Sequence, residues 1–449
     1  MTKPQSASVT KDAPAAFDGK GYRRVLISSF IGSTVEFYDF LLYGTAATLV
    51  FGPLFFPRLG SAAALTISFA TFAAGYLSRP LGAVVFGRLG DRIGRKSTLV
   101  ITMSIMGGAS TLIGVLPTAS QIGVAAPLLL LALRILQGIA VGGEWGGAAL
   151  MALEHAPEKE RGFAASAANM GAPAGGLLGT LAFAAVALLP APQLMAWGWR
   201  IPFLLSAVLV GFALYVRVRV SESPLFVAAR ERAEKSATGQ RSPILVVFRR
   251  YPGHVAVATL ASLATFLYAI FMVTFGVTIA RSAGLSATTV LACAALASFV
   301  HVFAIGFYAR LSDRVGRKRV LLLGCVLSFV FAFPLLMLLS SGRPVLVLAG
   351  YLLGSPIIQG CLLGPLAAYI SERFATESRY TGASVSYQFG SFLGSFTPMV
   401  CALLWSAGQR SFGTAGWTQF TFVGLFLVGV TAVSAAAIAS SRETLGNAL

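Results

Sequence analysis

The stretch Gly87-Arg-Leu-Gly-Asp91-Arg92-Ile-Gly94-Arg95-Lys96 decides the fold, because the chain contains it twice. It recurs as Ala309-Arg-Leu-Ser-Asp313-Arg314-Val-Gly316-Arg317-Lys318, an offset of 222 residues. The segment from Glu154 to Arg161 is echoed in the same way by the segment from Glu372 to Arg379. Repeats at nearly one spacing predict a chain built from two similar halves.

The composition around these stretches is that of a membrane protein. Of the 449 residues, 56% are hydrophobic and only 11% are charged. In a soluble protein, roughly a quarter of all residues are charged. The net charge of +18 would suit a nucleic-acid binder, but the basic residues stand in short breaks between apolar runs. Nucleic-acid binders carry their basic patch on a polar surface. We therefore expect a lipid bilayer, and no nucleic acid, around this chain.

Twelve apolar runs are long enough to cross a bilayer, which takes roughly 20 residues. None alternates as a β-barrel strand does, so helices are expected to satisfy the backbone in lipid. The runs lie near residues 25–51, 62–87, 97–117, 122–153, 162–190, 199–220, 254–281, 288–309, 320–340, 344–371, 380–407 and 417–440. The sequence thus predicts an all-α polytopic fold, with twelve transmembrane helices in two pseudo-symmetric six-helix bundles.

The predicted organisation has five parts. They are an N-terminal tail (1–24), a first bundle (25–220), a central loop (221–252), a second bundle (253–440) and a C-terminal tail (441–449). The side that holds both tails and the central loop carries 27 of the 34 lysines and arginines. Because positive residues collect in cytoplasmic loops, both termini are predicted to be cytoplasmic. The first 20 residues lack the apolar run of a cleaved signal peptide, so the first span should direct insertion into the inner membrane.

The repeated stretch resembles the loop signature of the major facilitator superfamily, each time after the second span of a half. Arg134-Ile-Leu-Gln137-Gly138 resembles the superfamily's fourth-helix motif. The stretches that narrow the match to the metabolite:proton symporter family are 32–44, 78–82, 142–147 and 222–226. This resemblance implies the major facilitator fold and proton-driven uptake of a small metabolite. The metabolite is usually an organic acid such as a dicarboxylate, a tricarboxylate or a shikimate-like acid, although some relatives take betaines or proline.

The residue types of the signature are suited to a gate that controls exchange between conformations. Gly87 lets two helices approach closely, and Asp91 can pair with a basic residue or sit at a helix N-terminus. The second copy has Ala309 in place of this glycine. The residues expected to govern conformational exchange are Gly87, Asp91, Arg92, Gly94, Arg95, Lys96, Asp313, Arg314, Gly316, Arg317 and Lys318.

Three acids lie deep inside apolar spans, namely Glu36, Asp39 and Glu144. A charge inside a bilayer is costly, so each should face a cavity or a partner, and we expect them to carry proton coupling. Structural ion pairs or interhelical polar contacts are their alternative roles. Asp39 and Arg134 both lie near the middle of their spans, so the two are expected to meet. A substrate anion bound to Arg134 would then change the affinity of Asp39 for its proton.

Arg134, interpreted as the only deep cation, is the natural ligand for a substrate carboxylate. His301 is the one histidine within a span, and an interhelical hydrogen bond is its alternative role. The other candidates for the substrate cavity are Tyr43, Gln137, Gln359, Tyr387 and Gln388. The cysteines stand singly in apolar stretches and predict no disulfide, metal site or cofactor; they are Cys293, Cys325, Cys361 and Cys401.

The sequence predicts a proton-coupled importer of a small carboxylate that works as a monomer and is not an enzyme. A proton-coupled exporter, which differs only in how the gradient is used, is one alternative. A symporter of a zwitterion such as a betaine or proline is the other. An ATP-driven pump is disfavoured because the chain has no GxxxxGK[ST] loop, and a receptor is disfavoured because the tails and the central loop are short.

Overall fold

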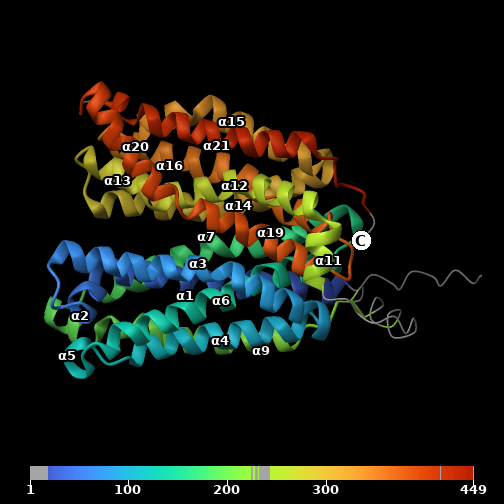
Figure 1. Cartoon of the computed structure of the whole chain (residues 1–449), viewed down its shortest axis with the longest axis horizontal. Helices are drawn as coiled ribbons and strands as arrows, with labels where there is room; N and C mark the ends of the chain where they lie inside the picture. The colour runs from blue at the N-terminus through green and yellow to red at the C-terminus, as the bar shows by residue number, and fades with distance from the viewer. Residues whose placement is uncertain (1–18, 224–225, 228–230, 232–242, 415, 448–449) are drawn as a thin grey trace, which may run out of the picture.

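The helices of the computed structural model form two bundles, one from each half of the chain. Figure 1 shows the blue-to-green half below the yellow-to-red half, with the long helices of both running side by side. The structure describes residues 19–223, 226–227, 231, 243–414 and 416–447, and every regular element among these residues is helical. Most of the expected N-terminal tail (1–24) and half of the expected central loop (221–252) lie outside the described residues.

The first bundle contains six long helices joined by short helical turns. In chain order its elements are α1 (Gly19–Ala46), η1 (Ala47–Phe51), α2 (Gly52–Phe55), α3 (Ser61–Ile93), α4 (Arg95–Val115), α5 (Ala119–Ile122), α6 (Ala125–Glu154), η2 (Glu158–Glu160), α7 (Arg161–Val186), α8 (Ala191–Gln193), η3 (Leu194–Gly198) and α9 (Arg200–Val218).

The second bundle is more interrupted, because three of its spans break into shorter helices. Its elements are α11 (Pro243–Arg250), α12 (Pro252–Val273), α13 (Phe275–Ser282), α14 (Ala287–Val315), α15 (Arg317–Leu339), α16 (Pro344–Leu352), η4 (Leu353–Gln359), α17 (Gly360–Leu363), α18 (Leu366–Ser371), α19 (Arg379–Gly394), α20 (Thr397–Phe412), η5 (Trp417–Phe420) and α21 (Thr421–Ser440). Pro356 stands inside η4, where a proline removes a helical hydrogen bond.

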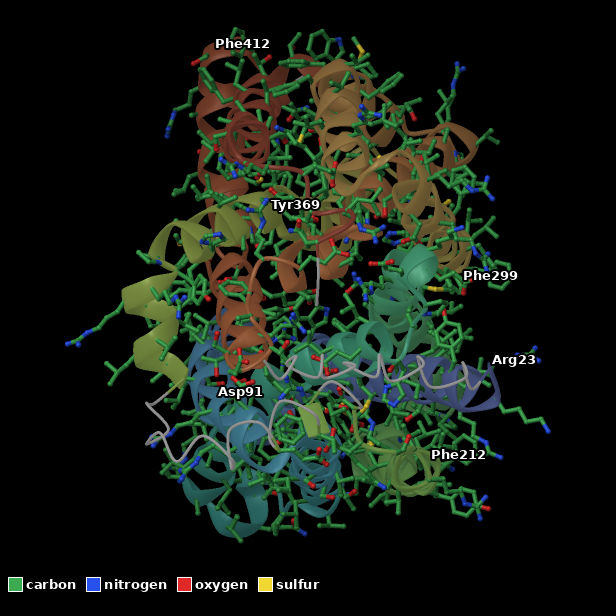
Figure 2. All side chains as sticks on the ribbon, turned by 90° about the vertical axis from the view of Figure 1, so that its right-hand side faces the viewer. Arg23, Asp91, Phe212, Phe299, Tyr369 and Phe412 are labelled. Carbon is green, nitrogen blue, oxygen red and sulfur yellow. The ribbon has the colours of Figure 1, made fainter. Side chains whose placement is uncertain are left out.

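The predicted membrane fold is confirmed. Eleven helical stretches of the described residues are long and apolar enough to cross a membrane, and α3, with 33 residues, occupies the place of the remaining predicted span. Large apolar side chains cover the outside, as Phe212, Phe299 and Phe412 illustrate at the periphery of Figure 2. Such a surface suits lipid, where a soluble protein would need charge.

The repeated stretch is helical almost throughout, which corrects its interpretation as a loop. Helices α3 and α14 continue to Ile93 and Val315, and the next helix of each half begins only two residues later. The break is a single glycine in each half, Gly94 with φ of 106° and Gly316 with φ of 108°. Glycine adopts such angles without strain.

Close packing of α3 against α6 sets the frame of the first bundle. A Cβ atom added at Gly82 would overlap the carbonyl of Ile139, and one added at Gly138 would overlap the carbonyl of Gly75. Helices in lipid associate through such close van der Waals contact, because lipid removes the hydrophobic driving force between them.

The two bundles meet along matching helices. The second long helix of each half packs against the fifth long helix of the other, so α3 contacts α19 and α14 contacts α7 (Figure 1). Gly87 permits one of these contacts, since a Cβ atom there would stand 3.0 Å from the Cα atom of Thr381.

We expect Gly138→Leu to destabilise the fold by about 1–3 kcal/mol, the usual cost of overpacking a tight contact. Gly108→Leu is the matched control, because a Cβ atom at Gly108 on α4 meets nothing within 4 Å. Thermal unfolding in detergent should show a lower midpoint for the first variant alone. Equal midpoints would contradict the close packing of α3 on α6.

Candidate functional site

We call the end of the bundles that carries the turns at Gly94 and Gly316 the motif end. It lies on the right of Figure 1 and faces the viewer in Figure 2, where Asp91 stands between blue α3 and orange α19. The carboxylate of Asp91 accepts hydrogen bonds from the backbone nitrogens of Tyr380 (3.3 Å) and Thr381 (3.0 Å) and from the Thr381 hydroxyl (2.7 Å). An aspartate of the first half therefore caps a helix of the second.

An aspartate of the second half makes the equivalent contact to a helix of the first half. The carboxylate of Asp313, at the end of α14, accepts from the backbone nitrogens of Gly162 (2.8 Å) and Phe163 (2.9 Å). These two nitrogens belong to the first turn of α7, as Tyr380 and Thr381 belong to the first turn of α19. The two halves are thus joined by a reciprocal pair of helix caps.

Buried ion pairs surround the cap at Asp91. Arg95 lies 3.5 Å from Asp91 and 3.5 Å from Glu154, and Arg379 of the second half lies 3.4 Å from Glu154. The side chains of Arg95, Asp91 and Glu154 are fully buried. Removing one partner of a buried pair costs about 3–5 kcal/mol, so the loss of any one of these charges should strongly destabilise this arrangement.

The second copy builds the equivalent ion pairs. Arg317 lies 2.7 Å from Asp313 and 3.3 Å from Glu372. Burial raises the pKa of Glu372 above its ordinary value, and Arg317 opposes that rise. The motif end is therefore closed by two similar charge clusters.

Two further glutamates cap the helices that follow the glycine turns. Glu222 accepts from the backbone nitrogens of Arg95 (3.1 Å) and Lys96 (3.2 Å), and Glu443 accepts from those of Arg317 (2.9 Å) and Lys318 (3.1 Å). Sequence reasoning missed both glutamates, although their spacing of 221 residues follows the repeat.

Arg92 and Arg314, by contrast, have exposed side chains at the motif end. They therefore lie outside both buried charge clusters.

Asp39 and Arg134 do not meet, contrary to expectation. Asp39 accepts a hydrogen bond from Ser206 of α9, whereas Arg134 donates to the carbonyl of Phe40 (3.3 Å) and to the side chain of Gln137 (3.2 Å). No ion pair joins the two within the described residues.

Polar side chains nevertheless link Asp39 to Arg134. The amide of Gln137 donates to the Ser110 hydroxyl at 2.7 Å, and Ser110 lies beside the carboxylate of Asp39. The connection runs through α4, which brings Ser110 between α1 and α6.

Arg134 is not the only deep cation either. Arg217, which sequence reasoning did not count among the deep charges, lies 2.7 Å from Glu144, and both side chains are almost fully buried. The pair joins α9 to α6, and the guanidinium fills the space beside Gly32 of α1.

Arg79 is the site residue that sequence reasoning passed over. It lies inside α3, is 2% exposed, and stands 4.0 Å from the centre of the Phe40 ring. Its one hydrogen bond within the described residues reaches Ser391 of the second half at 3.4 Å, and its Nε and Nη2 atoms have no partner there. An arginine inside an apolar run was the signal available in the sequence.

Glu36 faces the same region. Its side chain is 1% exposed, and neither carboxylate oxygen has a hydrogen-bond partner among the residues described. Arg79, Arg217 and Glu144 are the charges that act on it. Such an unpartnered buried carboxylate is rare and calls for a functional explanation.

The second half supplies an aromatic wall to this region. Tyr387 of α19 stacks on Trp145 of α6, with ring centres 3.4 Å apart and planes inclined by 4°. Tyr387 also lies near Arg79 and Glu36. Both amide atoms of the neighbouring Gln388 are buried without a hydrogen-bond partner in the described part of the chain.

The remaining candidates have no hydrogen bond to Arg79 or Glu36 in the described structure. The hydroxyl of Tyr43 donates to Thr71 at 2.9 Å within the first bundle. His301 lies against Gly360 of the second bundle, and Gln359 stands at the end of η4. The four cysteines are free and buried, and a search of the described residues finds no cluster suited to a metal.

The chain belongs to the Major Facilitator Superfamily, whose sequence profile matches residues 27–398. It is 39% identical over 429 residues to the inner membrane metabolite transport protein YhjE of Escherichia coli K12, covering 94% of each chain. It is 38% identical over 388 residues to the shikimate transporter of the same strain, covering 85% of this chain and 87% of that one.

A structure of the proton:xylose symporter XylE, bound to 6-bromo-6-deoxy-D-glucose, has the same fold. It matches with a TM-score of 0.72 at 14% identity, covering 92% of this chain and 95% of that one. The protein is therefore a membrane transporter and not an enzyme, as the sequence predicted.

We expect Asp91→Asn to open the motif end, because a neutral amide caps α19 more weakly and leaves Arg95 less compensated. Spin labels on the exposed residues Arg88 and Glu377, each changed to cysteine, should report longer distances in the variant. Transport should fall at least about tenfold while substrate binding stays within a few-fold.

The matched control is Arg92→Gln, which changes an exposed charge next to Asp91. It should leave the distances unchanged. Loss of binding by folded Asp91→Asn protein would contradict a gating role.

Proposed function

We propose that this protein imports a small carboxylate together with protons across the inner membrane by alternating access. The observation that carries the proposal is the pair of Arg79 and Glu36. Both are buried where the two halves meet, and both have polar atoms without partners in the described structure. A transporter of this fold binds its substrate between its halves near the bilayer midplane.

Arg79 is the proposed ligand for the substrate carboxylate. A buried guanidinium with two free nitrogens can bind a carboxylate through parallel hydrogen bonds. Arg134 adds a second positive charge, since its guanidinium stands 3.8 Å from the centre of the same Phe40 ring that Arg79 approaches at 4.0 Å. Two cations on one ring favour an anion over a neutral sugar, and the shikimate transporter among the relatives supports an organic acid.

Glu36 is the proposed proton carrier. Without substrate, the charge of Arg79 favours the ionised form of Glu36. A substrate carboxylate on Arg79 neutralises that charge, so Glu36 then binds a proton more readily. Anion and proton would therefore load together, as symport requires. Asp39 becomes the second candidate, because Ser206 already donates to it.

The caps at Asp91 and Asp313 are the proposed gate. The motif end and both tails carry most of the basic residues, so we place this end in the cytoplasm. The structure then corresponds to a state closed to the cytoplasm. Release of substrate requires both caps and their ion pairs to separate, while the bundles tilt about the central site.

We expect Glu36→Gln to abolish accumulation driven by a proton gradient while exchange of labelled for unlabelled substrate survives. The amide mimics the protonated acid, and exchange never needs the empty carrier to release its proton. Membrane vesicles loaded with substrate would measure both activities, and efflux on imposing an inward gradient would identify an exporter instead.

Asp39→Asn is the matched control, because it removes a buried acid from the same helix. It should keep gradient-driven accumulation at a reduced rate. If Asp39→Asn lost accumulation and Glu36→Gln kept it, Asp39 would be the proton carrier.

We expect Arg79→Ala to weaken binding of an anionic acid at least about 30-fold, since truncating a buried charge pair costs about 2–5 kcal/mol. Arg79→Lys should restore part of the affinity, because lysine keeps the charge but loses the planar fork. Binding of a panel of labelled organic acids and betaines to purified protein would measure this. Arg88→Ala, at an exposed position of the same helix, should bind normally. Unchanged acid binding by Arg79→Ala, with binding of betaines, would favour a zwitterion as the substrate.

A further inference from the structure

A basic pocket lies at the motif end of the second half, away from the central site. It has a volume of about 750 Å³, and its charged lining comes from Arg314, Lys318, Arg319, Arg442 and Glu443. These residues come from the end of α14, the start of α15 and the chain that follows α21. The C-terminal segment thus forms one wall of the pocket.

Two of these charges are already engaged. The ammonium of Lys318 donates to the carbonyls of Ala439 (2.7 Å) and Ser441 (2.8 Å), and Glu443 caps α15. The guanidinium groups of Arg314, Arg319 and Arg442 have neither an ion pair nor a hydrogen bond within the described residues. Three like charges around one pocket repel one another, and an anion would relieve that repulsion.

The first half repeats part of the structure around the pocket, because Glu222 caps α4 as Glu443 caps α15. There Phe226 packs over the glycine turn, since a Cβ atom at Gly94 would stand 3.3 Å from its ring, and Arg95 lies 4.6 Å from the ring centre. The three atoms nearest to a Cβ atom added at Gly316 all belong to Glu443.

An apolar surface continues from the pocket along α15. Val315 and Leu322 line the pocket beside the arginines. Beyond them Leu323, Val326 and Val330 are 41%, 53% and 59% exposed on a membrane-spanning helix. Their spacing of three and four residues places them on one face. A basic pocket that opens onto an apolar helix face matches a phosphate group attached to acyl chains.

We propose that this pocket binds the phosphate of an anionic phospholipid from the cytoplasmic leaflet. The choice of leaflet rests on the orientation proposed above. The chemistry recognised is a phosphate with a net negative charge, and the apolar face of α15 selects its lipid form over free phosphate. The bound lipid also steadies the gate, because Arg442 belongs to the segment whose Asn447 accepts from Arg161 (3.4 Å) and donates to the carbonyl of Glu372 (3.4 Å).

The test is binding of dioctanoyl phosphatidylglycerol to the purified full chain in detergent, followed by calorimetry. The variant Arg314→Gln/Arg319→Gln/Arg442→Gln should bind it at least tenfold more weakly than the unaltered chain. The control Arg88→Gln/Arg92→Gln/Arg219→Gln removes the same charge from exposed positions outside the pocket and should bind within twofold. The single variant Arg319→Glu gives a second measurement and should also weaken binding at least tenfold.

Two further probes separate the sources of phosphate. Dioctanoyl phosphatidylcholine and inorganic phosphate should both bind at least tenfold more weakly than phosphatidylglycerol. Tight binding of inorganic phosphate would overturn the lipid assignment, and equal losses in both triple variants would overturn the pocket itself. Because no transport is measured, failure here leaves the proposed carboxylate import standing, and failure of that import leaves this result standing.

Discussion

The structure depends on two carboxylates that each cap a helix of the opposite half. Asp91 holds the first turn of α19, and Asp313 holds the first turn of α7. Each is a charge-assisted contact to backbone N–H groups, buried from water and backed by an arginine four residues later. Each half contributes one capping aspartate and one capped helix, so two equivalent contacts close the motif end. We therefore expect a change of charge at either aspartate to act on the contact between the halves.

The surroundings of the central charges depend on the contact between the two halves at the motif end. With the halves in contact there, Arg79 of α3 reaches Ser391 of α19, and Trp145 stacks on Tyr387. Arg79 and Glu36 remain short of hydrogen bonds in this closed state, which is costly in a low-dielectric region. The other deep acids have partners, because Glu144 forms an ion pair with Arg217 and Asp39 accepts a hydrogen bond from Ser206. The residues that lack partners are thus the ones that lie between the halves, where we propose that the substrate binds.

The repeat explains the architecture, and its failures indicate where the halves have specialised. The deep acids Glu36, Asp39 and Glu144 all belong to the first half, so we assign proton coupling to one bundle. Phe226 covers the turn at Gly94, and a basic pocket lies beside the turn at Gly316.

The sequence by itself determined the class of protein, the helical spans and the two copies of the charged stretch, because these follow from hydropathy and from a repeat. It also marked Glu36 as a buried acid. Only the tertiary structure decided the partners. It separated Asp39 from Arg134 through Ser110 and Gln137, gave Arg217 to Glu144, and brought Arg79 to the junction of the halves. The physical reason is that the depth of a residue can be estimated along one helix, whereas its neighbours depend on the rotation and close approach of helices that are far apart in the chain.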